Sequence, residues 1–210
     1  MPGFWPHVLE DASSNLGFDE HITPEDSEAL NNLAKLNVSR PNVEKGDPRD
    51  VEISFTFLDN EYMPAQTVTK LFTHQSSDTA GLTGLISTPS LITWKAGKDL
   101  TSGVNQAAFD AFEERKAKAA KADGKTSNKL GPKEEKLLKL LKKFNPSFFT
   151  WFSFSGNHEE LGETSENDAE GEQPMGPIEP FPYGDELAVQ ISDDVYPNAV
   201  KYFSMFSRYG

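Results

Sequence analysis

The segment Val51-Glu52-Ile53-Ser54-Phe55-Thr56-Phe57 alternates strictly between apolar and polar residues, and it constrains the fold more than any other part of the chain. Successive side chains of a strand point to opposite faces, so this alternation predicts a strand with one buried face. A sheet with an apolar face has to pack against another layer. The inward residues would be Val51, Ile53, Phe55 and Phe57.

Two more strands are predicted further along the chain, at Thr67–Phe72 and at Leu91–Trp94, and Leu36–Ser39 is expected to be a fourth that comes first. Turn-forming residues around Asp59–Asn60 and within Ser76–Gly84 separate the later strands. Short connections of this kind favour an antiparallel meander.

Helices are expected before and after the strands. Thr23 can cap a helix that starts at Pro24, because its hydroxyl accepts from a free backbone N–H and proline suits the first turn. Leu30, Leu33 and, as an alternative to its place in a strand, Leu36 would form the buried stripe of that helix. The expected fold class is α+β, an antiparallel four-stranded sheet packed with helices, in a single domain over residues 1–210.

Residues 104–145 form a lysine-rich helical segment. We expect one helix at Val104–Lys121 and a second at Lys133–Phe144, with leucines on one face of the second helix and lysines on the other. Residues 113–143 contain eleven basic and five acidic residues, a formal charge of +6 that leaves −19 for the rest of the chain. The lysines suit a solvated face, a localisation or nucleic-acid patch, or a membrane-surface helix. We favour buried leucines with an exposed basic rim.

The aromatic block Phe148-Phe149-Thr150-Trp151-Phe152, followed by Phe154, has two interpretations. Exposed rings can stack on nucleic-acid bases, but such sites normally draw affinity from phosphate contacts as well. The chain has a formal net charge of −13, which repels phosphates. We therefore expect these rings to lie in the core.

The same net charge limits the kinds of partner that the chain can bind. An acidic surface attracts basic proteins, so we expect no specific DNA binding. The chain has no cysteine, which excludes disulfides, thiolate catalysis and cysteine-ligated zinc. No apolar run approaches the roughly 18 residues that a membrane span needs, so no membrane partner is expected.

A strongly acidic run lies between the aromatic block and the last helix. It contains seven carboxylates and no basic residue, which predicts a disordered loop over residues 157–180 that binds basic partners by charge. The carboxylates are Glu159, Glu160, Glu163, Glu166, Asp168, Glu170 and Glu172.

The predicted last helix has an apolar face, and Glu186 and Asp193, seven residues apart, lie together on the opposite face. The pair Asp193-Asp194 has three interpretations: a metal or catalytic pair, a solvated surface, or an anchor for lysines and arginines of a partner. Adjacent residues on a helix point about 100° apart, so the pair converges poorly on one ion. The apolar face would consist of Leu187, Ala188, Ile191 and Val195.

The sequence shows no motif for catalysis or cofactor binding. Gly97-Lys98 lacks the hydroxyl residue that follows the lysine of a phosphate-binding loop, because Asp99 stands there. The four histidines, at positions 7, 21, 74 and 158, are scattered and lack the spacing of a zinc helix. We expect no cofactor and no enzymatic activity.

Four sequence blocks resemble the nucleosome assembly protein family, in particular its SET (template-activating factor) branch and its fungal members. The blocks occur in the family's order and span nearly the whole chain. They are Pro2-Gly3-Phe4-Trp5, Trp94-Lys95-Ala96-Gly97-Lys98-Asp99-Leu100-Thr101, Ser147-Phe148-Phe149-Thr150-Trp151-Phe152, and Gly184-Asp185-Glu186-Leu187 with Asp193-Asp194-Val195-Tyr196-Pro197-Asn198.

This resemblance implies the family's "earmuff" domain and its function, a nuclear histone chaperone with some cytoplasmic shuttling. Such a protein binds core histones through an acidic concave face and promotes nucleosome assembly. The matched blocks place Asp185, Glu186, Asp193 and Asp194 on that face. The resemblance also implies an alternative, a regulatory subunit that stimulates a histone acetyltransferase or inhibits a phosphatase. The family's N-terminal dimerisation helix and acidic C-terminal tail have no counterpart among the matched blocks, so we expect these 210 residues to be monomeric.

Overall fold

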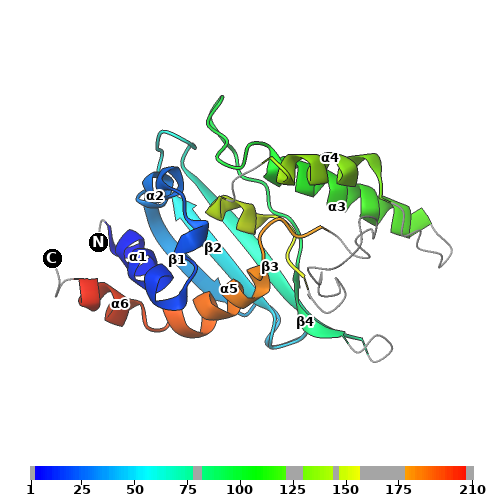
Figure 1. The fold of residues 1–210 in the computed structure, drawn as a ribbon. Helices are drawn as coiled ribbons and strands as arrows, with labels where there is room; N and C mark the ends of the chain where they lie inside the picture. The colour runs from blue at the N-terminus through cyan, green and yellow to red at the C-terminus, as the bar shows by residue number, and fades with distance from the viewer. Residues whose placement is uncertain (1–2, 78–81, 122–129, 144–146, 157–177, 207–210) are drawn as a thin grey trace, which may run out of the picture.

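The strictly alternating strand lies inside the sheet, with neighbours on both sides. The structure, a computed structural model, describes residues 3–77, 82–121, 130–143, 147–156 and 178–206 (Figure 1). Strand β2 spans Val51–Phe57, and its four apolar side chains are at most 1% exposed. The predicted strand and its inward face are confirmed.

Four strands form one antiparallel meander in the order β1-β2-β3-β4, as predicted. Leu36, Phe55 and Val68 are register partners across the first three strands, and all three are buried. The apolar face is therefore continuous from strand to strand. The other strands are β1 (Leu33–Ser39), β3 (Gln66–Ser77) and β4 (Leu82–Ser87).

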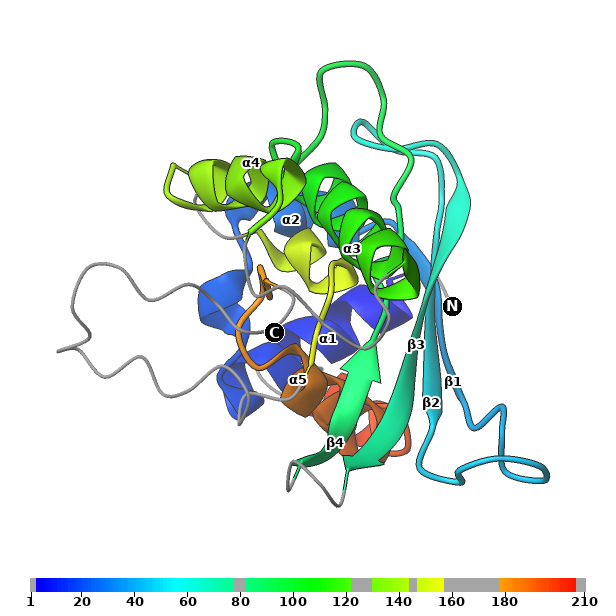
Figure 2. The ribbon, with the colours of Figure 1, turned by 90° about the vertical axis from the view of Figure 1, so that its right-hand side faces the viewer.

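The two faces of the sheet have different surroundings. In Figure 2 the described helices lie on one side of the sheet. The other side carries cross-strand hydroxyl pairs, Ser54 with Thr69 and Thr56 with Thr67, each with oxygens 2.9 Å apart. Short hydroxyl side chains satisfy one another and water, so this face requires no covering layer.

The fourth strand is not the predicted one. Leu91–Trp94 has no regular secondary structure, and β4 pairs instead with the second half of β3. A side chain holds the backbone of the mispredicted segment: Gln66 Nε2 donates to the Thr93 carbonyl at 2.8 Å, and the Thr93 N–H donates to Gln66 Oε1 at 3.0 Å. Gly84 lies inside β4, and glycine weakens the strand signal of a sequence.

Helix α2 spans Pro24–Leu30 and begins where Thr23 predicts, but it ends earlier than the leucine spacing suggests. Leu33 and Leu36 belong to β1, so the helical stripe over these leucines is wrong and the alternative first strand is right. Two asparagines at positions 31 and 32, poor helix formers, separate the two elements.

Helices from both ends of the chain cover the apolar face. Helices α1 and α6 lie side by side, with the tilted rings of Phe4 and Phe203 5.0 Å apart between centroids (Figure 1). Trp5 of α1 stacks on Tyr196, which directly follows η4, at 5.9 Å between centroids. The apolar face predicted for the last helix is buried. The elements of this layer are α1 (Phe4–Leu16), the 3-10 turn η1 (Asp19–His21), α2, α5 (Gly184–Gln190), the π-turn η4 (Ile191–Val195) and α6 (Ala199–Phe206).

The aromatic block forms the centre of the core. Residues Phe148–Phe152 fold into a 3-10 turn, η2, and all its side chains are at most 1% exposed. Phe55 of β2 has the ring centroids of Trp151 and Phe152 at 5.7 and 5.4 Å. The interpretation of these rings as core residues, and not as a platform for bases, is confirmed.

The lysine-rich segment forms a helical hairpin at one end of the molecule, from α3 (Val104–Lys121) and α4 (Pro132–Leu141). The hairpin has a small core of its own, in which alanines of α3 meet Leu137 of α4. Phe112 stacks on Phe154 at 5.9 Å and joins the hairpin to the segment that follows the aromatic turn η2.

A buried carboxylate joins α2 to η2. Asp26 is 0% exposed and completes a capping box, in which its Oδ2 accepts from the Thr23 N–H at 3.0 Å. The same side chain accepts from Ser147 Oγ at 2.6 Å and from the Phe148 N–H at 2.9 Å. One side chain thus fixes a helix start and the entry to the aromatic turn.

We expect Asp26→Ala to lower the free energy of unfolding by about 2–4 kcal/mol, because it removes a helix cap and leaves buried donors without an acceptor. Urea denaturation would measure this. Glu25→Ala, an exposed change in the same helical turn, is the control and should cost no more than about 0.5 kcal/mol. Equal losses for the two variants would contradict the role of Asp26.

Candidate acidic binding surface

The four motif carboxylates lie on one continuous helical stretch formed by α5 and η4. The first two are in the first turn of α5, where negative charge complements the helix dipole. The other two are in η4, where the Tyr196 N–H donates to the Ile191 carbonyl at 2.9 Å. Pro197 has no N–H to continue the helix, which breaks between η4 and α6. The four are Asp185, Glu186, Asp193 and Asp194.

The start of α5 is anchored in the core through Gly184. Trp151 Nε1 donates to the Gly184 carbonyl at 2.8 Å, and the Gly184 N–H donates to Glu179 Oε1 at 3.2 Å. A Cβ on this glycine would lie 2.3 Å from Ser155 Oγ, so a larger residue requires a shift. The glycine therefore lets the acidic motif approach the core closely.

A buried lysine lies beside this anchor. Lys70 takes an inward position of β3 and is 0% exposed. Its Nζ donates to the Trp151 carbonyl and, at 2.7 Å, to Ser155 Oγ, and it lies 4.8 Å from the centroid of the Trp151 ring. These bonds connect β3 of the sheet to η2 and to the segment that follows it.

The ionisable groups of this buried region shift one another's pKa values. Burial lowers the pKa of Lys70 well below its ordinary value, and the negative charges of Glu179 and Asp185 oppose that shift. Burial also raises the pKa of Glu179 to about 7, and repulsion from Asp185 adds to the rise. Asp185 is half-buried. It thus acts on interior groups as well as on the surface.

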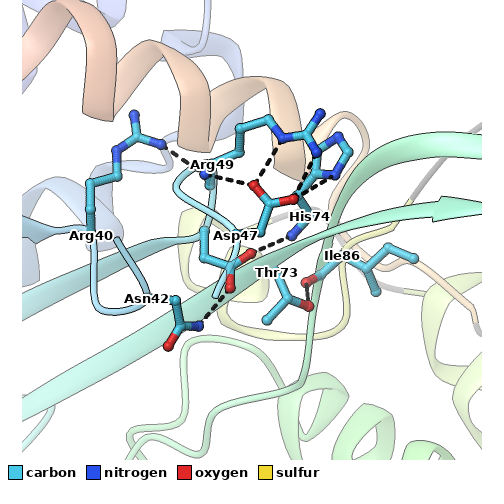
Figure 3. Close-up of polar contacts among 8 residues, drawn as sticks. Arg40, Asn42, Asp47, Arg49, Thr73, His74 and Ile86 are labelled. Atoms are coloured by element: carbon cyan, nitrogen blue, oxygen red, sulfur yellow. Dashed lines mark hydrogen bonds and ion pairs between the residues drawn. The ribbon is translucent and has the colours of Figure 1, made fainter. Parts of the chain in front are cut away.

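Asp193 is held by an arginine from the loop that follows β1. Arg40, just after β1, donates from Nη2 to Asp193 Oδ1 at 2.8 Å, with both side chains partly exposed. Arg40 is itself positioned by a bond from Nη1 to the Arg49 carbonyl at 3.0 Å (Figure 3). Arg49 is paired with Asp47 at 2.7 Å, and the hydrogen bonds from Arg49 hold the pKa of Asp47 well below its usual range.

The loop that carries Arg40 is fixed to β3. Asp50, which is buried, accepts from Asn42 Nδ2 at 2.6 Å and from the His74 N–H at 2.7 Å. Figure 3 shows this bracing, with Asp47 between Arg49 and the ring of His74. The guanidinium that meets Asp193 is therefore presented by an ordered loop.

Asp194 is engaged in hydrogen bonds within the fold. It accepts from Asn198 Nδ2 at 2.8 Å and from the Tyr202 hydroxyl at 2.7 Å. Burial raises the pKa of Tyr202 to about 12, and the hydrogen bond to Asp194 contributes to the rise. The phenol therefore stays protonated and donates, which fastens α6 to η4. Asp193 and Asp194 thus contact different groups, as helix geometry predicts for adjacent residues.

Glu186 has a different environment from the other motif carboxylates. It is exposed, and no hydrogen bond or ion pair joins it to another residue that the structure describes. Together with Asp193 it gives α5 and η4 an outward acidic edge. The seven carboxylates from Glu159 to Glu172 lie outside the described residues. Ile178, Glu179 and Pro180, at the end of the predicted loop, are packed or partly buried.

Three residues of this region escaped the sequence analysis. Lys70 is flagged by the alternation of Val68 and Phe72 on either side, which places it inward. Arg40 and Glu179 have no comparable local signal, because their partners are distant in sequence or lie in an irregular segment. Within the described ranges, no group of three His, Cys, Asp or Glu side chains is placed to hold a metal ion, and no helix is long and apolar enough to cross a membrane.

The raised pKa of Glu179 predicts a pH-dependent stability. Between pH 4.5, the ordinary pKa of a glutamate, and about pH 7, the side chain of Glu179 loses its proton in the unfolded chain but keeps it in the folded chain. The contribution of Glu179 to stability is therefore fully present below pH 4.5 and is lost as the pH rises to about 7, by about 3 kcal/mol.

We expect Glu179→Gln to remove this loss. The free energy of unfolding of the variant should therefore rise relative to that of the wild type as the pH increases from 4.5 to about 7. Urea denaturation at several pH values would measure the difference. Glu186→Gln, an exposed change on the neighbouring helix, should leave the pH profile of the wild type unchanged. A stability difference between Glu179→Gln and wild type that is independent of pH would contradict the assignment.

Known proteins resemble this chain along nearly its whole length. A Schizosaccharomyces pombe protein named as a nucleosome assembly protein, C36B7.08c, is 30% identical over 210 residues, which cover 96% of this chain and 62% of that protein. NAP1-related protein 2 of Arabidopsis thaliana is 30% identical over 208 residues, which cover 97% of this chain and 58% of that protein. The chain thus spans about three-fifths of the length of these relatives.

Solved structures share the fold. The crystal structure of Ccp1 superposes with a TM-score of 0.54 at 28% identity and covers 98% of this chain and 75% of that one. The structure of the Vps75 histone chaperone gives a TM-score of 0.60 at 23% identity, with 99% and 79% covered, and shows likeness of fold. The profile of the nucleosome assembly protein (NAP) family matches residues 1–205, and the chain belongs to that family.

Proposed function

We propose that the protein is a histone chaperone that binds core histones through its acidic surface and promotes nucleosome assembly. The observation that carries the proposal is the family match over residues 1–205. The formal net charge of −13 and the outward acidic edge at Glu186 and Asp193 support it. The proposed role is nuclear, with cytoplasmic shuttling, and does not include catalysis.

The physical basis is competition for histone charge. Histones are basic, and an acidic surface holds their lysines and arginines until DNA, with its denser charge, replaces it. Exposed charges are screened within about 8 Å at physiological ionic strength, so the affinity should fall with salt. Binding that is moderate and reversible suits a protein that has to release its cargo.

The Arg40–Asp193 pair adds to this reversibility. An incoming arginine has to displace Arg40 from Asp193, so part of the electrostatic gain is spent on separating an existing pair. Glu186 has no such competitor among the described residues. We therefore assign Glu186 and Asp193 to histone contact and give Asp185 and Asp194 supporting roles in positioning α5 and α6.

The alternative role, a regulatory subunit of a histone acetyltransferase or a phosphatase inhibitor, stays a prediction. No contact among the described residues favours it over the chaperone role. A stable complex with such an enzyme that survives loss of the acidic edge would support it.

We expect the double variant Glu186→Gln, Asp193→Asn to bind core histones about two- to thirty-fold more weakly, since exposed charge contacts contribute about 0.2–1 kcal/mol each. Titration of fluorescent core histones at about 0.15 M and 0.3 M salt would measure this, with poly-glutamate as the reference for generic acidity. Transfer of the bound histones to DNA would be scored in a nucleosome assembly assay.

The matched control is Glu135→Gln, Asp59→Asn, which makes the same change of charge at one exposed carboxylate without a described partner and one paired with Lys95. It should keep wild-type affinity, and circular dichroism should show both variants folded. Wild-type binding no tighter than that of poly-glutamate would refute a shaped chaperone surface. Equal losses in the two variants would refute the assignment to α5 and η4.

A further inference from the structure

The second helix of the hairpin carries a row of exposed lysines. Four lysines on α4 and directly after it are exposed, and none forms an ion pair with a residue that the structure describes. Other cations of the hairpin that the structure describes are paired, as in Arg115 with Glu134 at 2.8 Å and Lys133 with Asp110 at 3.4 Å. The row, which we call the lysine row, consists of Lys136, Lys139, Lys142 and Lys143.

The opposite face of α4 is committed to the hairpin core. Leu137 is 1% exposed, and Leu140 and Leu141 pack against the same cluster. A helix that binds a membrane surface needs a free apolar face, so this arrangement does not suit lipid. What the row offers a partner is positive charge, spread over about 10 Å of helix axis from Lys136 to Lys143.

We propose that the lysine row binds the phosphate backbone of double-stranded nucleic acid without selecting a sequence. A duplex carries one negative charge for about every 1.7 Å of its axis, so several lysines on one helix face can meet phosphates at once. Lysine binds phosphate as a flexible point charge and imposes no bidentate geometry, so a row of lysines suits contacts with a phosphate backbone that do not select a sequence. Helix α4 has no Arg, Asn or Gln, the residues that most often pair with base edges.

The position of the row keeps it apart from the acidic edge. In both ribbon views α4 lies at one end of the molecule and α6, which follows Asp193 and η4, lies at the other (Figures 1 and 2). The net charge of −13 weakens binding to nucleic acid overall, but charges beyond the screening length contribute little at physiological salt. A basic protein and a duplex can therefore be held by different ends of one molecule.

The test compares two triple variants of the whole chain. Lys136→Gln, Lys139→Gln, Lys143→Gln removes most of the row, and the control replaces three exposed lysines elsewhere that also have no described ion pair. Binding of a fluorescent random-sequence duplex of about 25 base pairs would be followed by anisotropy from about 0.05 to 0.2 M salt. The control variant is Lys35→Gln, Lys45→Gln, Lys201→Gln.

We expect the row variant to lose at least about ten-fold in affinity at the lowest salt, while the control stays near wild type. The slope of log affinity against log salt should fall by about 2–3, at about 0.9 for each phosphate contact. Equal affinities for the two variants, or no duplex binding by the wild type, would overturn the proposal. Row-dependent binding of poly-glutamate as tight as that of the duplex would assign the row to acidic polypeptides instead.

Core-histone titrations of the same two variants separate this inference from the proposed function. The lysine row does not belong to the acidic edge, so its loss should leave histone affinity at the level of the control. Failure of histone binding in the wild type would refute the chaperone role and leave the duplex result to be judged by itself. Thermal unfolding would show that both variants are folded.

Discussion

The aromatic turn at Phe148–Phe152 is the constraint on which the rest of the structure depends. The apolar face of the sheet needs a filling that no single helix supplies, and these tightly spaced rings provide it around Phe55. A compact turn of bulky rings leaves buried polar groups that need hydrogen-bond partners, and three elements supply them. Asp26 accepts from the entry to the turn, Lys70 donates to its Trp151 carbonyl, and Gly184 accepts from the indole. Helix α2, the sheet and the acidic helical stretch are therefore positioned from one cluster.

Much of this arrangement follows from local pattern. Alternation predicts β2 and its buried face, the Thr23 cap predicts the start of α2, and the spacing of Leu187 and its neighbours predicts the buried side of the last helix. The failures occur where tertiary contacts decide. Leu91–Trp94 has strand composition, but Gln66 already satisfies its backbone, while β4 is stabilised by a long β3 that can pair beyond the end of β2. Local periodicity contains no information about Gln66 as the partner of Leu91–Trp94, or about β3 as the partner of β4.

The candidate site shows the same division. Sequence blocks locate four carboxylates, yet their environments differ within one helical stretch, because the partners of Asp193 and Asp194 come from other elements of the fold. Arg40 lies 153 residues before Asp193, and Tyr202 reaches back to Asp194 from the next helix. Negative charge at these positions is thus partly neutralised or engaged in the fold. Net charge alone overstates how much of an acidic chain is available to a partner. The comparison of Glu186 with its neighbours identifies the part that is available.

The core of the hairpin is small and largely made of alanine, with Val104, Leu137 and few larger side chains. Alanine buries little apolar area, so this cluster contributes less cohesion than the ring-filled core beneath the sheet. We therefore expect the hairpin to open at a lower free energy than the sheet. Its amide protons should exchange with solvent while those of β2 stay protected. A region that opens locally can follow the contour of a partner, whereas the sheet and its aromatic filling keep their shape.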